Sequence, residues 1–191
     1  MNAALSEPKR HKLSRDQYYR MAETGILAPD ARVELINGEI IDMVPIGNSH
    51  AGTVDYLAMK LTKAIDGNGI VRVQGPISLG EYSEPEPDLS VLKFREDYYR
   101  TGDVHPSSAD ILLLIEVAVS SLAYDTDIKM PLYAQHQVTE VWLVVPEEKK
   151  LVVYSDVEND RYQNVRTAFN LDDLAVPGLQ NCVMDLSDIF A

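Results

Sequence analysis

The chain has 191 residues, of which 46% are apolar, and a net charge of −13, which fits one globular domain and argues mildly against broad affinity for nucleic acid. No apolar stretch is long enough to cross a bilayer, and residues 1–12 lack the apolar segment of a secretory signal. Cys182 is the only cysteine, which excludes an intrachain disulfide and favours a cytoplasmic location. We expect a disordered arm over residues 1–12 and a single domain over residues 13–191.

The first predicted elements are a short helix and a β-hairpin. Ser14 and Gln17 have the spacing of a capping box, so we expect a helix that runs from there to about Glu23. Asn37-Gly38, the preferred core of a type I′ turn, separates two apolar runs and predicts a hairpin over residues 33–43.

A longer helix and an interrupted strand come next. Apolar side chains at helical spacing predict a helix over residues 50–65, for which Asn48 or Ser49 provides the cap. Residues 70–79 favour a strand that is broken at Gly75-Pro76.

The chain is organised around the apolar run Ile111-Leu-Leu-Leu-Ile-Glu-Val-Ala-Val119. An alternating run would have one wet face, whereas this run has none, so it predicts a strand that is buried on both faces of a sheet. A shorter strand over residues 88–92 precedes it and is entered through Glu84-Pro-Glu-Pro87, whose prolines keep the backbone extended. The polar residues 94–110 between the two strands predict a long loop with at most one helical turn.

A third helix is predicted over residues 125–137, with Ile128, Leu132 and Tyr133 available for packing. Pro131 leaves two alternatives open, because proline suits only the first turn of a straight helix. Either the helix begins near Ile128, or it is kinked at Pro131.

These elements predict an α/β fold of the restriction endonuclease-like kind, a central mixed sheet flanked by helices with β-hairpins at the edges. The two longer helices would cover opposite faces, and a C-terminal hairpin over residues 151–169 would extend one edge. The predicted sheet contains the hairpin at 33–43 and strands at 70–79, 88–92, 111–119 and 140–145. The residues after 170 favour no particular element.

Glu116 is a carboxylate in the middle of the buried run, and burying it without compensation costs several kcal/mol. Two compensators are available in the sequence: a metal ion shared with Asp88, or the ammonium group of Lys129. The loop between the two strands can bring Asp88 beside Glu116. Carboxylate oxygens suit Mg²⁺ or Mn²⁺, and a lysine within reach would complete a site for phosphodiester hydrolysis.

The order of these motifs resembles the PD-(D/E)XK nuclease superfamily, and in detail its bacterial restriction endonuclease-like family. The resemblance spans roughly residues 30–155. The matching stretches are Val33-Glu-Leu-Ile-Asn-Gly-Glu39, Glu86-Pro-Asp-Leu89, Ile115-Glu-Val117 with Ser120-Ser121, Tyr124-Asp125 to Lys129, Tyr133-Ala134, and Glu140-Val-Trp-Leu-Val144.

The resemblance implies that Asp88 and Glu116 bind the metal together with the main-chain carbonyl of Val117, and that Glu34 assists. The sequence departs from the superfamily pattern at position 118, where alanine stands in place of lysine. Lys129 on the next helix matches the relocated lysine of the family. A second departure is Gln137, where the family usually has a glycine that ends this helix.

Each residue also has a structural alternative. Glu116 and Lys129 could form a buried structural ion pair, Asp88 could terminate a turn, and Glu34 could be an exposed strand residue. Asp125 could be only an N-cap. His50 and Gln74 are weak candidates near the site, Tyr133 could pack beneath Lys129, and the loop residues Arg95, Tyr98, Tyr99 and Arg100 could contact bases or form an ordinary loop. His11, His105 and His136 lack zinc-site spacing.

We therefore predict a Mg²⁺- or Mn²⁺-dependent endonuclease that acts on DNA, with Asp88, Glu116, Lys129 and Glu34 in the catalytic site. The superfamily resemblance also implies a homodimer. The lack of a membrane-length apolar stretch predicts no membrane association. One alternative is a catalytically silent nuclease fold that serves as a binding or assembly module. Another is a hydrolase of smaller phosphoesters.

Overall fold

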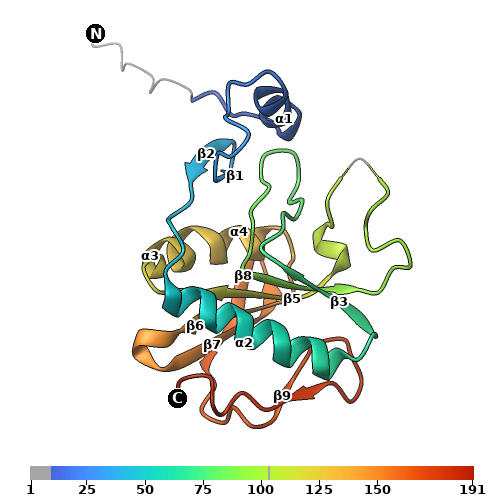
Figure 1. Cartoon of the computed structure of the whole chain (residues 1–191), viewed down its shortest axis with the longest axis vertical. Coiled ribbons are helices and arrows are strands. Elements are labelled where there is room, and N and C mark those ends of the chain that lie inside the picture. The colour runs from blue at the N-terminus through green and yellow to red at the C-terminus, as the bar shows by residue number, and fades with distance from the viewer. Residues whose placement is uncertain (1–9, 103) are drawn as a thin grey trace.

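The centre of the computed structural model, which describes residues 10–102 and 104–191, is a six-stranded sheet in the order β3-β4-β5-β6-β7-β8 (Figure 1). Strands β5 and β6 are parallel and every other neighbouring pair is antiparallel, so the predicted mixed sheet is confirmed. The strands are β3 Gly69–Val73, β4 Leu89–Lys93, β5 Ile111–Val117, β6 Glu140–Val145, β7 Lys150–Glu158 and β8 Arg161–Thr167. The β7–β8 hairpin extends one edge, as predicted.

Strand β5 is covered on both faces because its side chains alternate between two apolar layers. Leu113 and Ile115 pack in one layer with the helix α2 (Asn48–Ile65). Leu114 packs in the other layer with the helix α4 (Met130–Gln135). The two helical regions therefore lie on opposite faces, and Glu116 is enclosed as the sequence predicted.

Helix α2 begins earlier than predicted. Gly47 is its N-cap and makes no side-chain hydrogen bond, so the predicted capping by Asn48 or Ser49 is wrong. Both residues are already helical because the extended backbone of Gly47 starts the first turn before them. The consequence is that His50 lies in the first turn of α2, at the end that faces the candidate site.

The third helical region runs over residues 122–135, as α3 (Leu122–Tyr124), a π-helical turn (Asp125–Lys129) and α4. Pro131 lies in the first turn of α4, where it has no N–H group to donate. The π-helical turn before it is wider than an α-helical turn. The predicted start at 125 is therefore wrong. Ile128 is 41% exposed and does not pack, whereas Leu132 and Tyr133 are buried.

Gln137 follows this helix with a positive φ of 61°. A left-handed residue commonly ends a helix, and glycine adopts this conformation without strain. Gln137 therefore occupies a backbone position that a glycine would adopt without strain.

The predicted hairpin exists, but it is not part of the central sheet. Strands β1 (Val33–Ile36) and β2 (Glu39–Asp42) pair around Asn37-Gly38, both with positive φ, and form a separate two-stranded sheet. Leu35 makes a bridge with Glu84, in the segment before β4. The prolines in that segment lack N–H groups and cannot continue a ladder, which explains why the hairpin docks there without joining the sheet.

The first and last described segments of the chain lie beside these elements. Helix α1 (Arg15–Glu23) has the predicted capping box of Ser14 and Gln17. Of the predicted N-terminal arm, residues 1–9 lie outside the described residues, while Arg10 forms an ion pair with Glu39 at 3.4 Å.

Two short strands close the C-terminal part, β9 (Leu174–Ala175) and β10 (Val183–Met184), and they pack against the α2 side of the sheet. Two short 3-10 turns, at Ser108–Asp110 and Pro146–Glu148, complete the regular structure. Among the described residues, no helix is both long and apolar enough to cross a membrane.

Candidate active site

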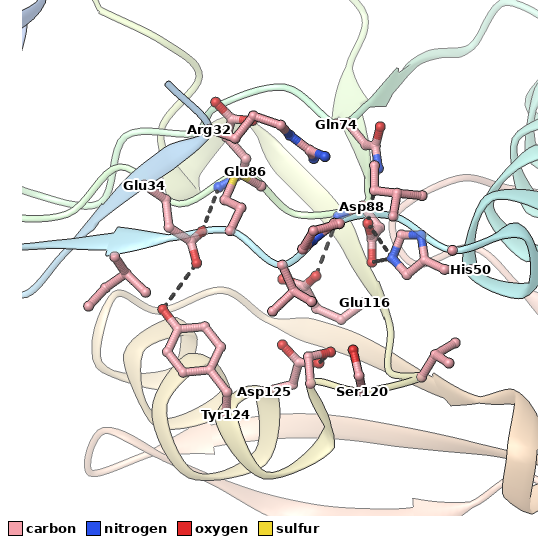
Figure 2. A pocket seen from close by; sticks show the side chains of 18 of the residues that line it. Arg32, Glu34, His50, Gln74, Glu86, Asp88, Glu116, Ser120, Tyr124 and Asp125 are labelled. Carbon is pink, nitrogen blue, oxygen red and sulfur yellow. Dashed lines mark hydrogen bonds and ion pairs between the residues drawn. The ribbon is translucent and has the colours of Figure 1, made fainter. Parts of the chain in front are cut away.

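A recess of about 440 Å³ opens between the β1–β2 hairpin and the central sheet (Figure 2). One side is the sheet side, formed by the start of β4, the end of β5 and the helical region 122–135. The other is the hairpin side, formed by β1, β2 and the segment 41–47 that leads into α2. Every predicted site residue with a side-chain role lies in this recess.

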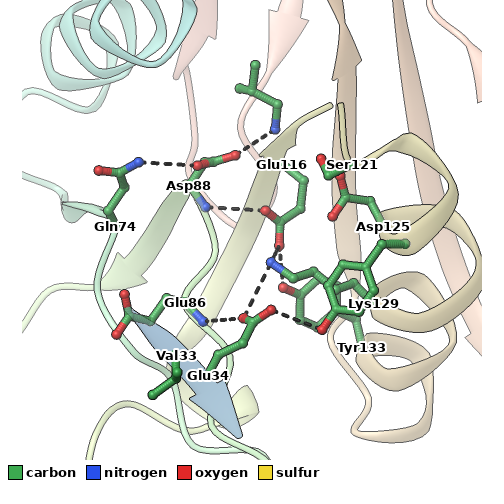
Figure 3. A network of polar contacts seen from close by, with 12 residues as sticks. Val33, Glu34, Gln74, Glu86, Asp88, Glu116, Ser121, Asp125, Lys129 and Tyr133 are labelled. Atoms are coloured by element: carbon green, nitrogen blue, oxygen red, sulfur yellow. Dashed lines mark hydrogen bonds and ion pairs between the residues drawn. The ribbon is translucent and has the colours of Figure 1, made fainter. Parts of the chain in front are cut away.

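Asp88 and Glu116 lie side by side on the sheet side. Leu89 of β4 pairs with Ile115 of β5 in an antiparallel register, so the preceding residue, Asp88, lies opposite Glu116. The Asp88 N–H donates to Glu116 Oε2 at 3.4 Å, and the Val117 N–H donates to Asp88 Oδ2 at 2.8 Å (Figure 3). The strand register thus brings two carboxylates together that are far apart in the sequence.

Glu116 is 2% exposed, and two donors from the helical region converge on one of its oxygens. Lys129 Nζ lies 3.2 Å from Oε1, and the Tyr133 hydroxyl donates to the same atom. Burial raises the pKa of the Glu116 carboxyl to about 8, and the Lys129 ammonium opposes this rise. Since both helical donors use Oε1, Oε2 is the oxygen directed toward Asp88.

Lys129 is 6% exposed and lies at the end of the π-helical turn. Its Nζ is 3.5 Å from Glu34 Oε2 in addition to its contact with Glu116. Burial lowers the pKa of the ammonium, but the surrounding carboxylates, Glu116 first and Glu34 next, outweigh burial and the pKa ends above its ordinary value. Lys129 therefore stays charged and links the two sides of the recess.

Glu34 reaches the site from β1 on the hairpin side. Its Oε1 accepts from the Tyr124 hydroxyl at 3.0 Å and its Oε2 accepts from the Glu86 N–H at 3.2 Å. The side chain is buried, so the alternative of an exposed strand residue is wrong. Glu86 lies beside it at the recess, where burial, followed by the charge of Glu34, raises the pKa of the Glu86 carboxyl.

His50 and Gln74 both contact Asp88. His50 Nε2 lies 3.0 Å from the carboxylate, while its buried Nδ1 has no hydrogen-bond partner among the described residues. The hydrogen bond to Asp88 raises the pKa of His50, against the effect of burial. The Gln74 amide is 3.5 Å from Oδ1, a weak contact.

The sequence places Tyr133 and Asp125 near the site but does not indicate the bonds that they make there. Tyr133 does more than pack beneath Lys129, because it is fully buried and its hydroxyl donates to Glu116. Its position four residues after Lys129, on the same helical face, is the sequence signal for this closeness. Asp125 is not an N-cap, because it lies inside the helical region, and its buried carboxylate accepts from Ser121 Oγ at 2.5 Å. Burial, opposed by Lys129, raises the pKa of the Asp125 carboxyl. No sequence signal separates this aspartate from a helix cap.

The aromatic loop lies elsewhere and its side chains contact one another. The Arg95 guanidinium stacks 4.3 Å from the centre of the Tyr99 ring and pairs with Asp97 at 2.8 Å. Arg100 lies 5.5 Å from the Tyr98 ring. These contacts fit the ordinary-loop alternative. The four histidines do not cluster, and only His50 lines the recess.

The residues present fit a magnesium-type ion. In the described part of the chain, no group of three or more histidine, cysteine or acidic side chains is arranged to hold a metal, so a zinc-like cage is absent there. Mg²⁺ needs only one or two carboxylates because it retains several waters. Asp88 and Glu116 supply two, and a cation beside them would also stabilise the buried charge of Glu116.

A mixed sheet that brings two acidic residues and a lysine to the edge of a recess defines a protein of the restriction endonuclease-like fold class. A family model described as "Uma2: Putative restriction endonuclease" matches residues 15–187. The chain belongs to this family, and the resemblance deduced from its motifs is confirmed.

Among solved structures, the chain is similar to a protein from Anabaena variabilis ATCC 29413 described as "a putative nuclease belonging to DUF820". The TM-score is 0.70 and the identity 17%, over 93% of this chain and 97% of the other, so the likeness shows the shared fold. No curated protein matches the chain.

Proposed function

We propose that the protein is a Mg²⁺-dependent endonuclease that hydrolyses phosphodiester bonds in DNA. The observation that carries this proposal is the convergence of three side chains at one place. Lys129 Nζ lies 3.2 Å from Glu116, whose other oxygen is 3.4 Å from the backbone nitrogen of Asp88. Membership of a nuclease family supports the same chemistry.

Asp88 and Glu116 would hold the ion, with the Val117 carbonyl as the third protein ligand. A divalent ion bound there supplies Lewis-acid chemistry and neutralises phosphoryl charge. Lys129 supplies a permanent positive charge that orients the attacking water or stabilises the charge developing on the phosphate. Glu34 assists from the hairpin side by holding Lys129 in place.

The test is whether the purified protein opens circular DNA, which has no ends for an exonuclease. A single-stranded circle and a supercoiled plasmid are incubated with Mg²⁺ or Mn²⁺, and the products are resolved on a gel. We expect at least one circle to be opened by the native protein and neither by Asp88→Ala or Lys129→Ala. Cleavage that survives both substitutions would point to a contaminant and contradict the proposal.

The alternative of a silent binding module is favoured by one feature of the site. Lys129 and Tyr133 already donate to Glu116, so the buried carboxylate is compensated without a metal. Calorimetric titration with Mn²⁺ separates the two functions. The endonuclease requires Mn²⁺ binding that is lost in Glu116→Ala, whereas a silent module would show no binding in the native protein.

The superfamily's usual pairing of two active sites leads us to propose a homodimer. Light scattering on the purified protein measures its mass directly. A mass of one chain at the concentrations used for cleavage would exclude the dimer.

A further inference from the structure

The candidate metal ligands lie deep in the recess, and the volume of the recess suits one nucleotide. Glu116 is 2% exposed and the Asp88 side chain 13%. The recess has a volume of about 440 Å³, which is in the range of pockets that enclose small molecules. A phosphate must therefore leave the surface and enter between the hairpin side and the sheet side.

The acidic side chains that line the recess are unsuited to binding the phosphates of a double helix. Proteins hold duplex DNA mainly through lysine and arginine contacts to phosphates on both sides of the site. Lys129 is already paired with Glu116 and Glu34, so among the described residues that line the recess, Arg32 is the remaining lysine or arginine. The six acidic residues that line the recess are Glu34, Asp42, Glu86, Asp88, Glu116 and Asp125.

The hairpin side offers apolar contact in place of charge. The segment between β2 and α2 places Met43, Val44, Pro45 and Ile46 along the recess. Val44 is 56% exposed and Ile46 39%, so both present apolar surface to a ligand that enters the recess. Val119 lines the opposite side. These side chains match the flat, apolar face of a base.

We propose that the site accepts a single DNA strand and excludes paired duplex, with a base adjoining the scissile phosphate packed against the segment 43–46. This inference rests on the endonuclease function proposed above. A paired base cannot reach the segment without being unstacked and extruded, which costs a few kcal/mol, whereas an unpaired base is free to do so.

The test compares initial cleavage rates on a single-stranded DNA circle and a relaxed, covalently closed duplex circle of the same sequence, with Mn²⁺ present. We expect the single-stranded circle to be opened at least about tenfold faster, because the duplex must first unpair. Equal rates on both circles would overturn the inference while leaving the endonuclease function intact. Failure to open either circle would remove the endonuclease function itself.

A double variant tests the contact with the base. In Val44→Ser/Ile46→Ser, we expect the KM for single-stranded DNA to rise about tenfold, because both replacements remove apolar contact with the base. Both positions are exposed, so the fold is retained and the variant remains measurable. The matched control is Val165→Ser on β8, 53% exposed and outside the recess, which should leave the KM unchanged. An unchanged KM in the double variant would refute the base contact.

Discussion

The two sides of the recess are held in different ways. On the sheet side, Glu116 belongs to a strand enclosed between two apolar layers. On the hairpin side, α1 contributes no buried residue and is attached by polar contacts, among them the Tyr18 hydroxyl to the Val33 carbonyl at 3.0 Å and Tyr19 to Glu84. Only one strand of the hairpin, β1, is deeply buried.

This difference indicates which side of the recess positions the proposed catalytic residues more firmly. Apolar packing is dense and resists displacement, so it holds Asp88, Glu116 and Lys129 firmly. Polar contacts contribute little net stability individually, because each replaces hydrogen bonds to water. We therefore expect substitutions on the sheet side to affect catalysis more than equivalent substitutions on the hairpin side.

The largest expected effect is that of Asp88→Ala, which removes one proposed ligand from the sheet side. We expect DNA cleavage to fall about 1,000-fold or more, a loss typical of removing a central electrostatic group. The control is Asp42→Ala, an exposed aspartate on the hairpin side of the same recess, with an expected change below about twofold. Similar losses in both variants would remove the contrast between the two sides.

Lys129→Met should abolish most activity and also destabilise the protein. Removing one partner of a buried ion pair costs about 3–5 kcal/mol in the free energy of unfolding when the other partner remains charged. The loss should be smaller at pH 6 than at pH 9, because Glu116 can take up a proton at the lower pH. Urea denaturation at both pH values measures this, with the exposed Lys63→Met as control. An equal loss at both pH values would contradict the pairing.

The raised pKa of Glu116 predicts a pH dependence of metal binding. Below a pKa of about 8 the carboxyl carries a proton that a metal ion must displace, so Mn²⁺ affinity should fall about tenfold per pH unit from pH 8 to pH 6. In the metal-free protein, the folded state binds this proton between the ordinary value of 4.5 and about 8. The free energy of unfolding should therefore decrease as the pH rises through that interval.

Calorimetry at several pH values measures the Mn²⁺ affinity. For the pH dependence of unfolding in the metal-free protein, Glu116→Gln is the control because it cannot titrate. A Mn²⁺ affinity that stays constant between pH 6 and pH 8 in the native protein would show that Glu116 is already ionised there.

Tyr133→Phe removes the hydroxyl that holds Glu116 Oε1 and leaves the ring in place. We expect activity to fall about tenfold, as is typical when a partner of a metal ligand is lost, and stability to fall by about 2 kcal/mol. Tyr162→Phe is the matched control, since it also loses a hydrogen bond, 2.9 Å to the Val138 carbonyl, but Tyr162 does not line the recess. A purely structural role for Tyr133 would make the two variants alike in activity.

The smallest effect should come from Glu34→Gln on the hairpin side. Tyr124 and Glu86 donate to different oxygens of Glu34, so the single amide oxygen of glutamine keeps one of these two hydrogen bonds, and the charge facing Lys129 is lost. We expect activity to fall less than about tenfold, with the same Mn²⁺ affinity as the native protein. A loss of Mn²⁺ binding would make Glu34 a metal ligand, and both sides of the recess would then contribute ligands.

Local rules determined much of this protein from its sequence. The capping box of α1, the Asn37-Gly38 turn and the buried strand around Glu116 each depend on neighbouring residues, so the sequence alone predicts them. The order of the acidic and lysine motifs was sufficient to predict the family and to select Asp88, Glu116 and Lys129 as neighbours.

Tertiary structure decided the rest. Whether the hairpin joins the sheet depends on which distant segment offers free N–H groups, and no local pattern encodes that choice. The burial of Asp125 and the bond from Tyr133 to Glu116 arise where the helical region packs on β5. The recess lies between the β1–β2 hairpin and the central sheet, which the chain brings together only on folding. Its depth, on which the proposed preference for single-stranded DNA rests, is therefore a property of the tertiary structure.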